Sequence, residues 1–318
     1  MKALVLAAGL GTRLRPFTLD RAKPSLPVVG IPALWYGAWH IKRELAIAEI
    51  AVNMSHAPET VREAGNDGEL QRSTGIRFHY SDESDRILGS SGALWKLAPW
   101  VDEKLLAVCN GDSICFPGWK KMLEFHGDRH ALLTLHVRAF DGADEPFTNV
   151  EVAPDGRVLG FGAKATSGVM FSGNYLLEPE LLKRLPAGVS ELRPTLLEPL
   201  IKERRLYAYR EDTAWFDTGN VAAYARAQFE LLSKIPAARE LVETKMREEK
   251  SGCWVPRDWV HGADPALQGP VVLSGGQGEW ATLNCVYGPR FVGIEAPPPG
   301  VSVPFSNAVV LSTHVGKI

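Results

Sequence analysis

The chain has 318 residues, of which 45% are hydrophobic, and a formal net charge of −2 at pH 7. This length and apolar content suffice for one large domain with its own core and a smaller second domain. The nearly balanced charge excludes the broad basic surface of a nucleic-acid-binding protein. No apolar run approaches the roughly 20 residues of a membrane span, and the four cysteines show no metal-binding spacing. We therefore expect a cytoplasmic protein with reduced thiols and with neither nucleic acid nor membrane as a partner.

The first thirty residues contain the most informative motif. An apolar run over residues 3–8 ends in Gly9-Leu10-Gly11-Thr12-Arg13, and Lys23 follows ten residues later. This order predicts a buried strand that leads into a phosphate-binding loop, in which glycines let backbone N–H groups approach phosphates and the cations balance their charge. The two glycines alone are equally compatible with a structural turn, because the third glycine of a dinucleotide fingerprint and a Walker lysine are both missing.

Between residues 31 and 138, short apolar runs alternate with helical patterns. This alternation predicts β-α-β units, and therefore an α/β fold with a Rossmann-like, mostly parallel sheet whose ligands lie at the carboxyl ends of the strands. The expected strands are 3–8, 50–54, 76–80, 105–109 and 131–138, and the expected helices are 31–46, 58–70, 92–100 and 117–126.

The pattern changes in the second half of the chain. The expected strands there are 150–152, 158–161, 169–177 and 206–209, and the expected helices are 178–185, 192–204, 220–232 and the highly charged 237–249. From Ser251 the chain is rich in Gly, Pro and Val, which favours a short β-helix-like domain over an irregular β tail. We expect a main domain over residues 1–233, a helical linker over 234–250 and the β-helix-like domain over 251–318.

Two aspartates are candidate metal ligands. Asp112 follows the expected strand 105–109, where a sheet offers its ligand crevice, and Asp217 lies far away in the segment Trp215–Gly219. Mg²⁺ prefers carboxylate oxygens together with substrate phosphates. Each residue also has a structural interpretation, because Asn-Gly-Asp is a common turn and Asp217 could cap the helix that begins near Asn220.

The loop Leu88–Leu94 consists mostly of small residues and precedes an expected helix. Its backbone amides could contact the edge of a flat base, since few side chains intrude. It could equally be a plain helix N-terminus capped by Ser90 or Ser91. Asp82 and Glu83, which lie upstream, could accept hydrogen bonds from a guanine edge or belong to a solvated loop.

The segment Leu6–Thr18, with Lys23-Pro24, closely resembles the signature of the sugar-1-phosphate nucleotidyltransferases, also called nucleotide-sugar pyrophosphorylases. The resemblance implies a glycosyltransferase-A-like nucleotidyltransferase fold, with the short left-handed β-helix that some members carry at their C-terminus. It also implies that Lys23 reaches the phosphates of both substrates. The residues implied to hold the nucleotide phosphates are Ala8, Gly9, Gly11, Thr12 and Arg13.

The same resemblance suggests roles for the other candidates. The family binds Mg²⁺ with an aspartate after the corresponding strand and another in a W-x-D-x-G motif, which implies a metal site at Asp112 and Asp217, with Asp112 also near the nucleotide. The loop containing Gly89, Ser90 and Gly92 would hold the base. Its form is closest to that of mannose-1-phosphate guanylyltransferase-like members, which favours GTP.

The sugar-binding positions depart from the family pattern. Asn149 and Lys164 stand where members usually carry a Tyr-Gly pair and a Glu-Lys pair, and Asn174 lies in Ser-Gly-Asn instead of Asn-Ala-Gly. We expect Lys23, Asn149, Lys164 and Asn174 to contact the sugar phosphate. Glu191 is a further candidate for hydroxyl contacts. These departures leave the identity of the sugar open.

The sequence therefore predicts an enzyme that joins an NTP to a sugar-1-phosphate and releases pyrophosphate. Its expected catalytic residues are Arg13, Lys23, Asp112 and Asp217, and its expected cofactor is Mg²⁺. GTP with mannose-1-phosphate is the first expectation for the substrates, and a UTP-dependent uridylyltransferase is the second. A non-catalytic subunit that senses nucleotide sugars is a further alternative, and the C-terminal segment could support a homo-oligomer.

Overall fold

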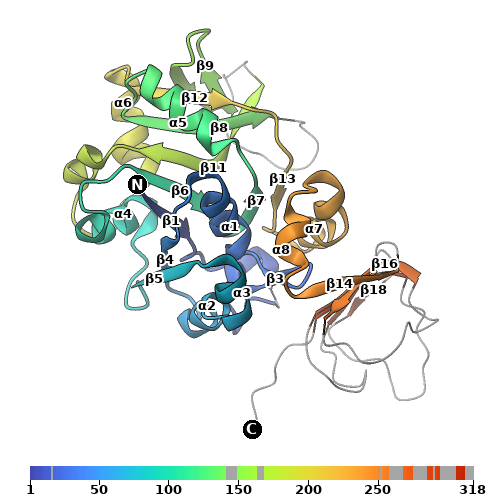
Figure 1. The fold of residues 1–318 in the computed structure, drawn as a ribbon. Coiled ribbons are helices and arrows are strands. Elements are labelled where there is room, and N and C mark those ends of the chain that lie inside the picture. Colours follow the sequence, from blue (N-terminus) through green and yellow to red (C-terminus); the bar gives the residue numbers. More distant parts are fainter. Residues whose placement is uncertain are drawn as a thin grey trace.

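The computed structural model describes residues 1–15, 17–140, 149–162, 168–250 and 253–257, and the later strands at 268–274, 285–288, 291–293 and 306–311. Helices cover both faces of a central nine-stranded sheet (Figure 1). Four neighbouring strands of this sheet run parallel in the order β6-β1-β4-β5. They are β1 (Lys2–Leu6), β4 (Glu49–Met54), β5 (Arg77–Asp82) and β6 (Leu106–Asn110).

The other strands of the sheet form a mixed wing. Strand β11 (Val169–Leu177) pairs antiparallel along one edge with β8 (Leu133–Ala139), and along its other edge with β6 and, near its start, with β9 (Asn149–Val152). Beyond them, β12 (Leu206–Arg210) lies parallel to β8, and β10 (Val158–Phe161) lies antiparallel to β9. The predicted α/β fold with a parallel sheet is thus confirmed at the centre, while the wing mixes both directions.

Helices and short elements connect these strands. The α-helices are α1 (Leu34–Leu45), α2 (Pro58–Gly65), α3 (Gly68–Thr74), α4 (Gly89–Val101), α5 (Trp119–Asp128), α6 (Glu198–Lys202), α7 (Val221–Lys234) and α8 (Ala238–Val242). The 3₁₀ segments are η1 (Thr12–Leu14), η2 (Lys23–Ser25) and η3 (Pro179–Arg184), and η4 (Arg193–Leu197) is a π-helical turn. The short strands are β2 (Pro27–Val28), β3 (Ile31–Pro32), β7 (Ser113–Cys115) and β13 (Trp215–Asp217). No helix in the described part of the chain is long and apolar enough to cross a membrane.

The core lies on both faces of the sheet, because successive side chains of a strand point to opposite faces. In β1, Ala3 and Val5 pack into the cluster that contains Trp35 of α1, whereas Leu4 packs into the cluster that contains Leu94 of α4. All five side chains are fully buried. Strand β1 is therefore held from both sides, and the loop that follows it begins from a rigid position.

The prediction of one helix over 237–249 was wrong in its second half. Helix α8 ends at Val242, and Met246–Lys250 forms strand β14, which pairs antiparallel with β15 (Cys253–Pro256). The burial of Met246 favours strand β14 over the expected helix: Met246 is only 2% exposed and packs against Gly30 in the main domain. The predicted helix 178–185 is instead the 3₁₀ segment η3, and the predicted helix 192–204 begins with the π-helical turn η4.

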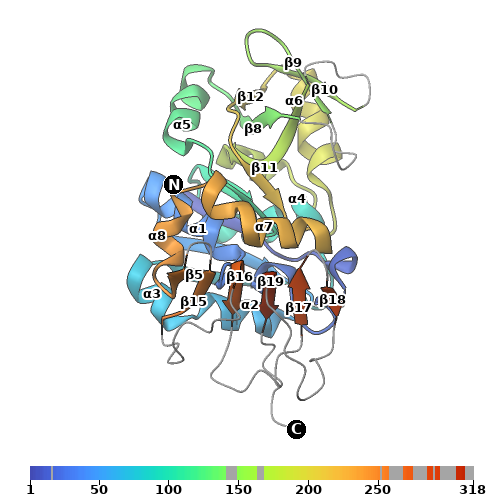
Figure 2. The same ribbon diagram turned by 90° about the vertical axis from the view of Figure 1, so that its right-hand side faces the viewer.

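The C-terminal strands form one mixed sheet in the order β14-β15-β16-β19-β17-β18. They comprise β16 (Gln268–Ser274), β17 (Cys285–Gly288), β18 (Phe291–Gly293) and β19 (Ser306–Leu311) besides the first two. Figure 2 shows β16, β19, β17 and β18 side by side below α7, which contacts β16 and β19. The segments between these strands lie outside the described residues, so the left-handed β-helix and the domain boundaries stay predictions.

Replacing Gly30 with alanine should destabilise the protein. Gly30 has φ +78° in the tight turn between β2 and β3, and a Cβ there would overlap the side chain of Met246. We expect a loss of about 2 kcal/mol or more in the free energy of unfolding, measured in urea. Gly75→Ala is the matched control, because Gly75 has φ +69° but no atom within 4 Å of its Cβ position. Its loss should be about 1 kcal/mol, and equal losses in both variants would contradict the proposed contact.

Candidate active site at the carboxyl ends of the parallel strands

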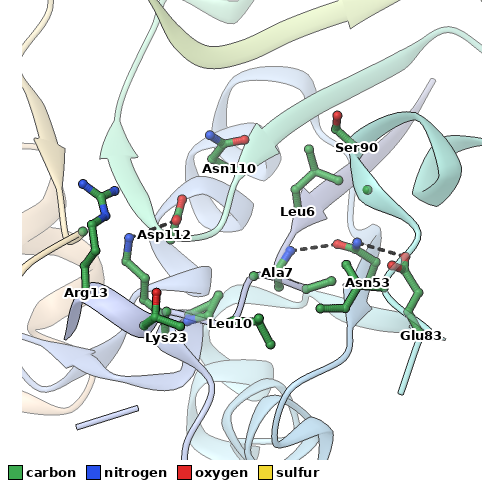
Figure 3. Close-up of a pocket in the computed structure, with 18 of the residues that line it drawn as sticks. Leu6, Ala7, Leu10, Arg13, Lys23, Asn53, Glu83, Ser90, Asn110 and Asp112 are labelled. Carbon is green, nitrogen blue, oxygen red and sulfur yellow. Dashed lines mark hydrogen bonds and ion pairs between the residues drawn. The ribbon is translucent and has the colours of Figure 1, made fainter. Parts of the chain in front are cut away.

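A pocket of about 540 Å³ opens where the four parallel strands end (Figure 3). The carboxyl ends of neighbouring parallel strands meet at one edge of a sheet, so residues distant in sequence share its wall. The lining residues are 6–13, Lys23, Pro24, Asn53, Glu83, Ile87, Gly89, Ser90, Asn110, Asp112, Glu191 and Gly219. The structure thus brings together the predicted phosphate loop, Lys23, Asp112 and the loop around Gly89.

The loop after β1 has the geometry of a backbone cradle. Gly11 has φ +62°, a conformation that few other residues adopt, and its carbonyl oxygen accepts a hydrogen bond of 2.8 Å from Oγ1 of Thr18. A Cβ built on Gly9 would meet no atom within 4 Å, so the backbone there faces open space. Thr12 and Arg13 are exposed at the pocket, while Leu14 is fully buried and anchors the loop.

Lys23 joins this loop to both candidate metal ligands. Its Nζ lies 2.9 Å from Oδ2 of Asp112 and 3.5 Å from Oδ1 of Asp217. The Lys23 side chain is only 7% exposed, and a buried ammonium group requires such partners. Figure 3 shows Lys23 directed toward Asp112, with Arg13 on the same side of the pocket. Lys23, Asp112 and Asp217 are therefore neighbours, and Arg13 lines the same end of the pocket as Lys23.

Pairing between two short strands places Asp217 beside Asp112. Strand β13 lies antiparallel to β7, with Asp217 opposite Ser113, and Oγ1 of Thr218 donates to the carbonyl oxygen of Asp112 at 2.7 Å. Gly219 leaves room for the Asp217 carboxylate, which a Cβ at that position would overlap. Asn220, not Asp217, caps helix α7, because Oδ1 of Asn220 accepts from the Ala223 N–H. The capping interpretation of Asp217 was therefore wrong.

The two aspartates fit a hard divalent cation that shares its ligands with a substrate. Among the described residues, no group of three or more His, Cys, Asp and Glu side chains gathers as a metal site. The protein would contribute two carboxylates, and phosphate oxygens and water would complete the shell, which is a common arrangement for Mg²⁺. Asp112 and Asp217 are the residues that would hold it.

Asn53 and Glu83 form a hydrogen-bonded chain that links three strand ends, and their part in this was not expected from the sequence. Oδ1 of Asn53 accepts from the Ala7 N–H at 2.8 Å, and its Nδ2 donates to Oε1 of Glu83 at 3.0 Å. Oε2 of Glu83 accepts from the Leu88 N–H at 3.1 Å. Glu83 is only 2% exposed, so its interpretation as part of a solvated loop was wrong, and burial raises the pKa of its carboxyl. A polar residue inside the apolar run 50–54 was the only sequence signal for Asn53.

Hydrogen bonds to Glu191 hold the loop over Gly89 and Ser90 in place. Ser90 donates to Oε2 of Glu191 from Oγ at 2.7 Å and from its backbone N–H at 3.3 Å. Gly89 has φ +75°, and a Cβ there would lie 2.6 Å from Oε1 of Glu191. Gly92 does not line the pocket; it packs against the backbone of Gly188, which excludes a side chain at that position.

Of the predicted sugar-phosphate residues that the structure describes, Lys23 lines this pocket and the two asparagines do not. Asn149 and Asn174 are absent from its lining, and Nδ2 of Asn174 donates to Oγ of Ser172 at 3.0 Å in the protein interior. Lys164 lies outside the described residues. A sugar-phosphate role for these three positions stays a prediction.

A buried histidine supports the strand that carries Asp217. Ring nitrogens of His136 lie 2.7 Å from Oγ of Ser172 and 3.1 Å from the carbonyl oxygen of Glu211. The Ser172 carbonyl oxygen in turn accepts from Nε1 of Trp215 in β13, at 3.1 Å. Burial lowers the pKa of His136 from 6.5 to about 4. The neutral His136 ring therefore supports β13 indirectly, through Ser172 and its hydrogen bond with Trp215.

Comparison with known proteins identifies the family. Residues 2–234, which cover the main sheet and α7, match the nucleotidyl transferase family. The chain belongs to the nucleotidyl transferase family. The predicted family and enzyme class are confirmed: the protein is a nucleotidyltransferase.

Relatives of this nucleotidyltransferase differ in the base that their names specify. A UTP–glucose-1-phosphate uridylyltransferase of Synechocystis is 28% identical, over 86% of this chain and 74% of the relative. A mannose-1-phosphate guanylyltransferase of Mycobacterium tuberculosis is 29% identical, over 74% of this chain and 67% of the relative. Among solved structures, HddC of Yersinia pseudotuberculosis complexed with GMP-PN has a TM-score of 0.61 at 20% identity, over 72% of this chain and 99% of that one. The last similarity shows a shared fold.

The stability of the nucleotidyltransferase should fall in acid through His136. Because the pKa is lowered to about 4 in the folded state, the unfolded chain binds more protons between pH 6.5 and 4, and stability is lost as the pH falls through that window. The lowered pKa of His136 makes the free energy of unfolding on the order of 3 kcal/mol larger above this window than below it. Urea unfolding at a series of pH values should show a shallower dependence for His136→Gln than for the wild type. Parallel pH profiles would contradict this assignment.

Proposed function

We propose that the protein transfers a nucleoside monophosphate from an NTP to a sugar-1-phosphate and releases pyrophosphate. The observation that carries the proposal is that Arg13, Lys23 and Asp112 line one end of a pocket, with the Asp217 carboxylate 3.5 Å from Nζ of Lys23. Two substrates that both carry phosphates repel each other. A site that combines fixed cations with carboxylates able to hold a divalent metal counteracts that repulsion.

The chain's own residues suit an in-line displacement at the α-phosphorus. An oxygen of the sugar phosphate forms a new P–O bond there, while the bond from the α-phosphorus to the bridging oxygen breaks and pyrophosphate leaves with the electron pair. The nucleophile is already an anion, so no general base is needed, and positioning carries the rate. In this proposal Arg13 and the cradle at Gly9 and Gly11 hold the phosphates of the nucleotide. Lys23 contacts both reactants, and Mg²⁺ bound by Asp112 and Asp217 would supply further charge neutralisation.

Glu83 favours GTP over UTP as the nucleotide. Its carboxylate lines the pocket and uses one acceptor site on each oxygen for Asn53 and the Leu88 N–H. A carboxylate has about four acceptor sites, so two remain. Guanine presents two adjacent N–H donors on one edge, whereas uracil presents a single N–H between two carbonyl oxygens. An additional carboxylate acceptor therefore matches guanine and repels the uracil carbonyls.

Pyrophosphate release with Mg²⁺ tests the activity and the substrates together. The assay pairs each common NTP with mannose-1-phosphate, glucose-1-phosphate and N-acetylmuramate-1-phosphate. We expect the highest kcat/KM with GTP and mannose-1-phosphate. A higher kcat/KM with UTP would make the protein a uridylyltransferase and overturn the role of Glu83. Absence of turnover, with nucleotide-sugar binding still seen by calorimetry, would favour a sensing subunit.

Loss of one charged group should affect turnover much more than folding. Arg13→Ala and Asp112→Asn should each lower kcat by roughly a hundredfold or more, since a single electrostatic contact contributes on the order of 3 kcal/mol in the transition state. The Arg13 side chain is exposed, so urea unfolding of Arg13→Ala should change little. Asp112→Asn removes one charged partner of the nearly buried Lys23, so some stability should be lost, but Asp217 still pairs with Lys23. Arg15→Ala is the matched control, because Arg15 is an exposed arginine outside the pocket lining. A wild-type kcat in either pocket variant would remove that residue from the mechanism.

A further inference from the structure

The two ends of the pocket carry different groups. The basic side chains in its lining, Arg13 and Lys23, lie at the end formed by the loop after β1, together with Asp112, the proposed metal ligand (Figure 3). Glu83 and Ser90 lie on the opposite side in the same view, and Ser90 is hydrogen-bonded to Glu191. A nucleotide that enters with its phosphates toward the cations therefore presents its nucleoside to two carboxylates. Carboxylates accept hydrogen bonds, and a nucleoside offers donors on its base and on its ribose.

The two carboxylates differ in depth. Glu83 is 2% exposed at the bottom of the nucleoside end, whereas Glu191 is exposed at the pocket rim. Discrimination between bases requires a desolvated contact, which the buried Glu83 can provide. The ribose connects the base to the phosphates, and its hydroxyls project from the side of that connection. Glu191, a hydrogen-bond acceptor at the pocket rim beside the loop over Gly89 and Ser90, is therefore available to the ribose.

One oxygen of Glu191 is held and the other is left for a ligand. Both hydrogen bonds from Ser90 reach Oε2, which fixes the direction of the carboxylate. Oε1 lies over the Cα of Gly89, where a Cβ would be only 2.6 Å away. Gly89 itself lines the pocket, so its missing side chain keeps the space beside Oε1 open. A prepositioned charged acceptor of this kind strengthens a hydrogen bond because little ordering remains to be done on binding.

We propose that Glu191 accepts a hydrogen bond from the ribose 2′-hydroxyl and selects ribonucleoside over 2′-deoxyribonucleoside triphosphates. This assignment rests on the proposed function, because it requires the nucleotide to lie with its phosphates at Lys23. A 2′-deoxy substrate leaves the carboxylate without its donor in the bound state. A hydrogen bond to a charged group differs from its absence by about tenfold or more in affinity.

Steady-state kinetics with paired nucleotides test the ribose assignment. The ratio of kcat/KM for GTP to that for dGTP is measured with a common sugar-1-phosphate. We expect a ratio of about ten or more for the wild type, and a ratio within about twofold of unity for Glu191→Ala. Because Glu191 is exposed, its truncation should leave the fold intact. A wild-type ratio near unity, or an unchanged ratio in Glu191→Ala, would overturn the assignment.

Ser90→Ala is the matched control. It removes the Ser90 hydroxyl contact to Glu191 but keeps the carboxylate and the backbone donor. If Glu191 only braced the loop, both variants would lower kcat/KM for the two nucleotides equally, and the ratio would stay constant in each. If Glu191 binds the ribose, Glu191→Ala brings the ratio near unity, whereas Ser90→Ala, which keeps the carboxylate and the backbone donor, changes the ratio much less. If Glu191→Ala turns over with an unaltered ratio, only the ribose contact is rejected. If the wild type shows no turnover with any NTP, the proposed function is rejected as well.

Discussion

The ion pairs of Lys23 with Asp112 and Asp217 are the interaction on which the site depends. Charged groups are buried only where partners compensate for lost hydration, so a nearly buried ammonium fixes the positions of its carboxylates. The three residues come from segments that are distant in the sequence. Lys23 follows the loop after β1, Asp112 follows β6, and Asp217 ends β13. Their convergence places Lys23 and the two carboxylates that we propose as metal ligands beside the carboxyl ends of the parallel strands.

A second constraint shapes the end of the pocket that contains Glu83 and Ser90. Asn53 ties the start of the loop after β1, through the Ala7 N–H, to Glu83 beyond β5, and Glu83 ties the chain to Leu88 before α4. Buried polar groups that are hydrogen-bonded to one another in this way hold one arrangement, because each alternative leaves a group unpaired. The result is a pocket with Arg13, Lys23 and Asp112 at one end and Glu83 and Ser90 at the other.

The sequence predicted the parts of the site that use distinctive residues. The glycine loop, Lys23 and the two aspartates stand at strand ends, and the structure places them together. Asn53 was not predicted as a site residue, because a single polar residue in an apolar strand does not indicate which residues it will hydrogen-bond. The helix expected over 237–249 failed for a related reason: the burial of Met246 against Gly30 is a long-range contact that outweighs local helix propensity.

A single-turnover measurement of Lys23 tests the account most directly. GTP labelled at the α-phosphorus is mixed with excess protein, Mg²⁺ and mannose-1-phosphate, for the wild type and for Lys23→Met. The account predicts that the wild type moves the label into a nucleotide sugar as pyrophosphate appears, and that Lys23→Met slows this transfer by roughly a hundredfold or more while still binding GTP. Transfer at the wild-type rate in Lys23→Met would contradict the central role of this lysine. Label released only as free GMP by the wild type would contradict the transfer itself.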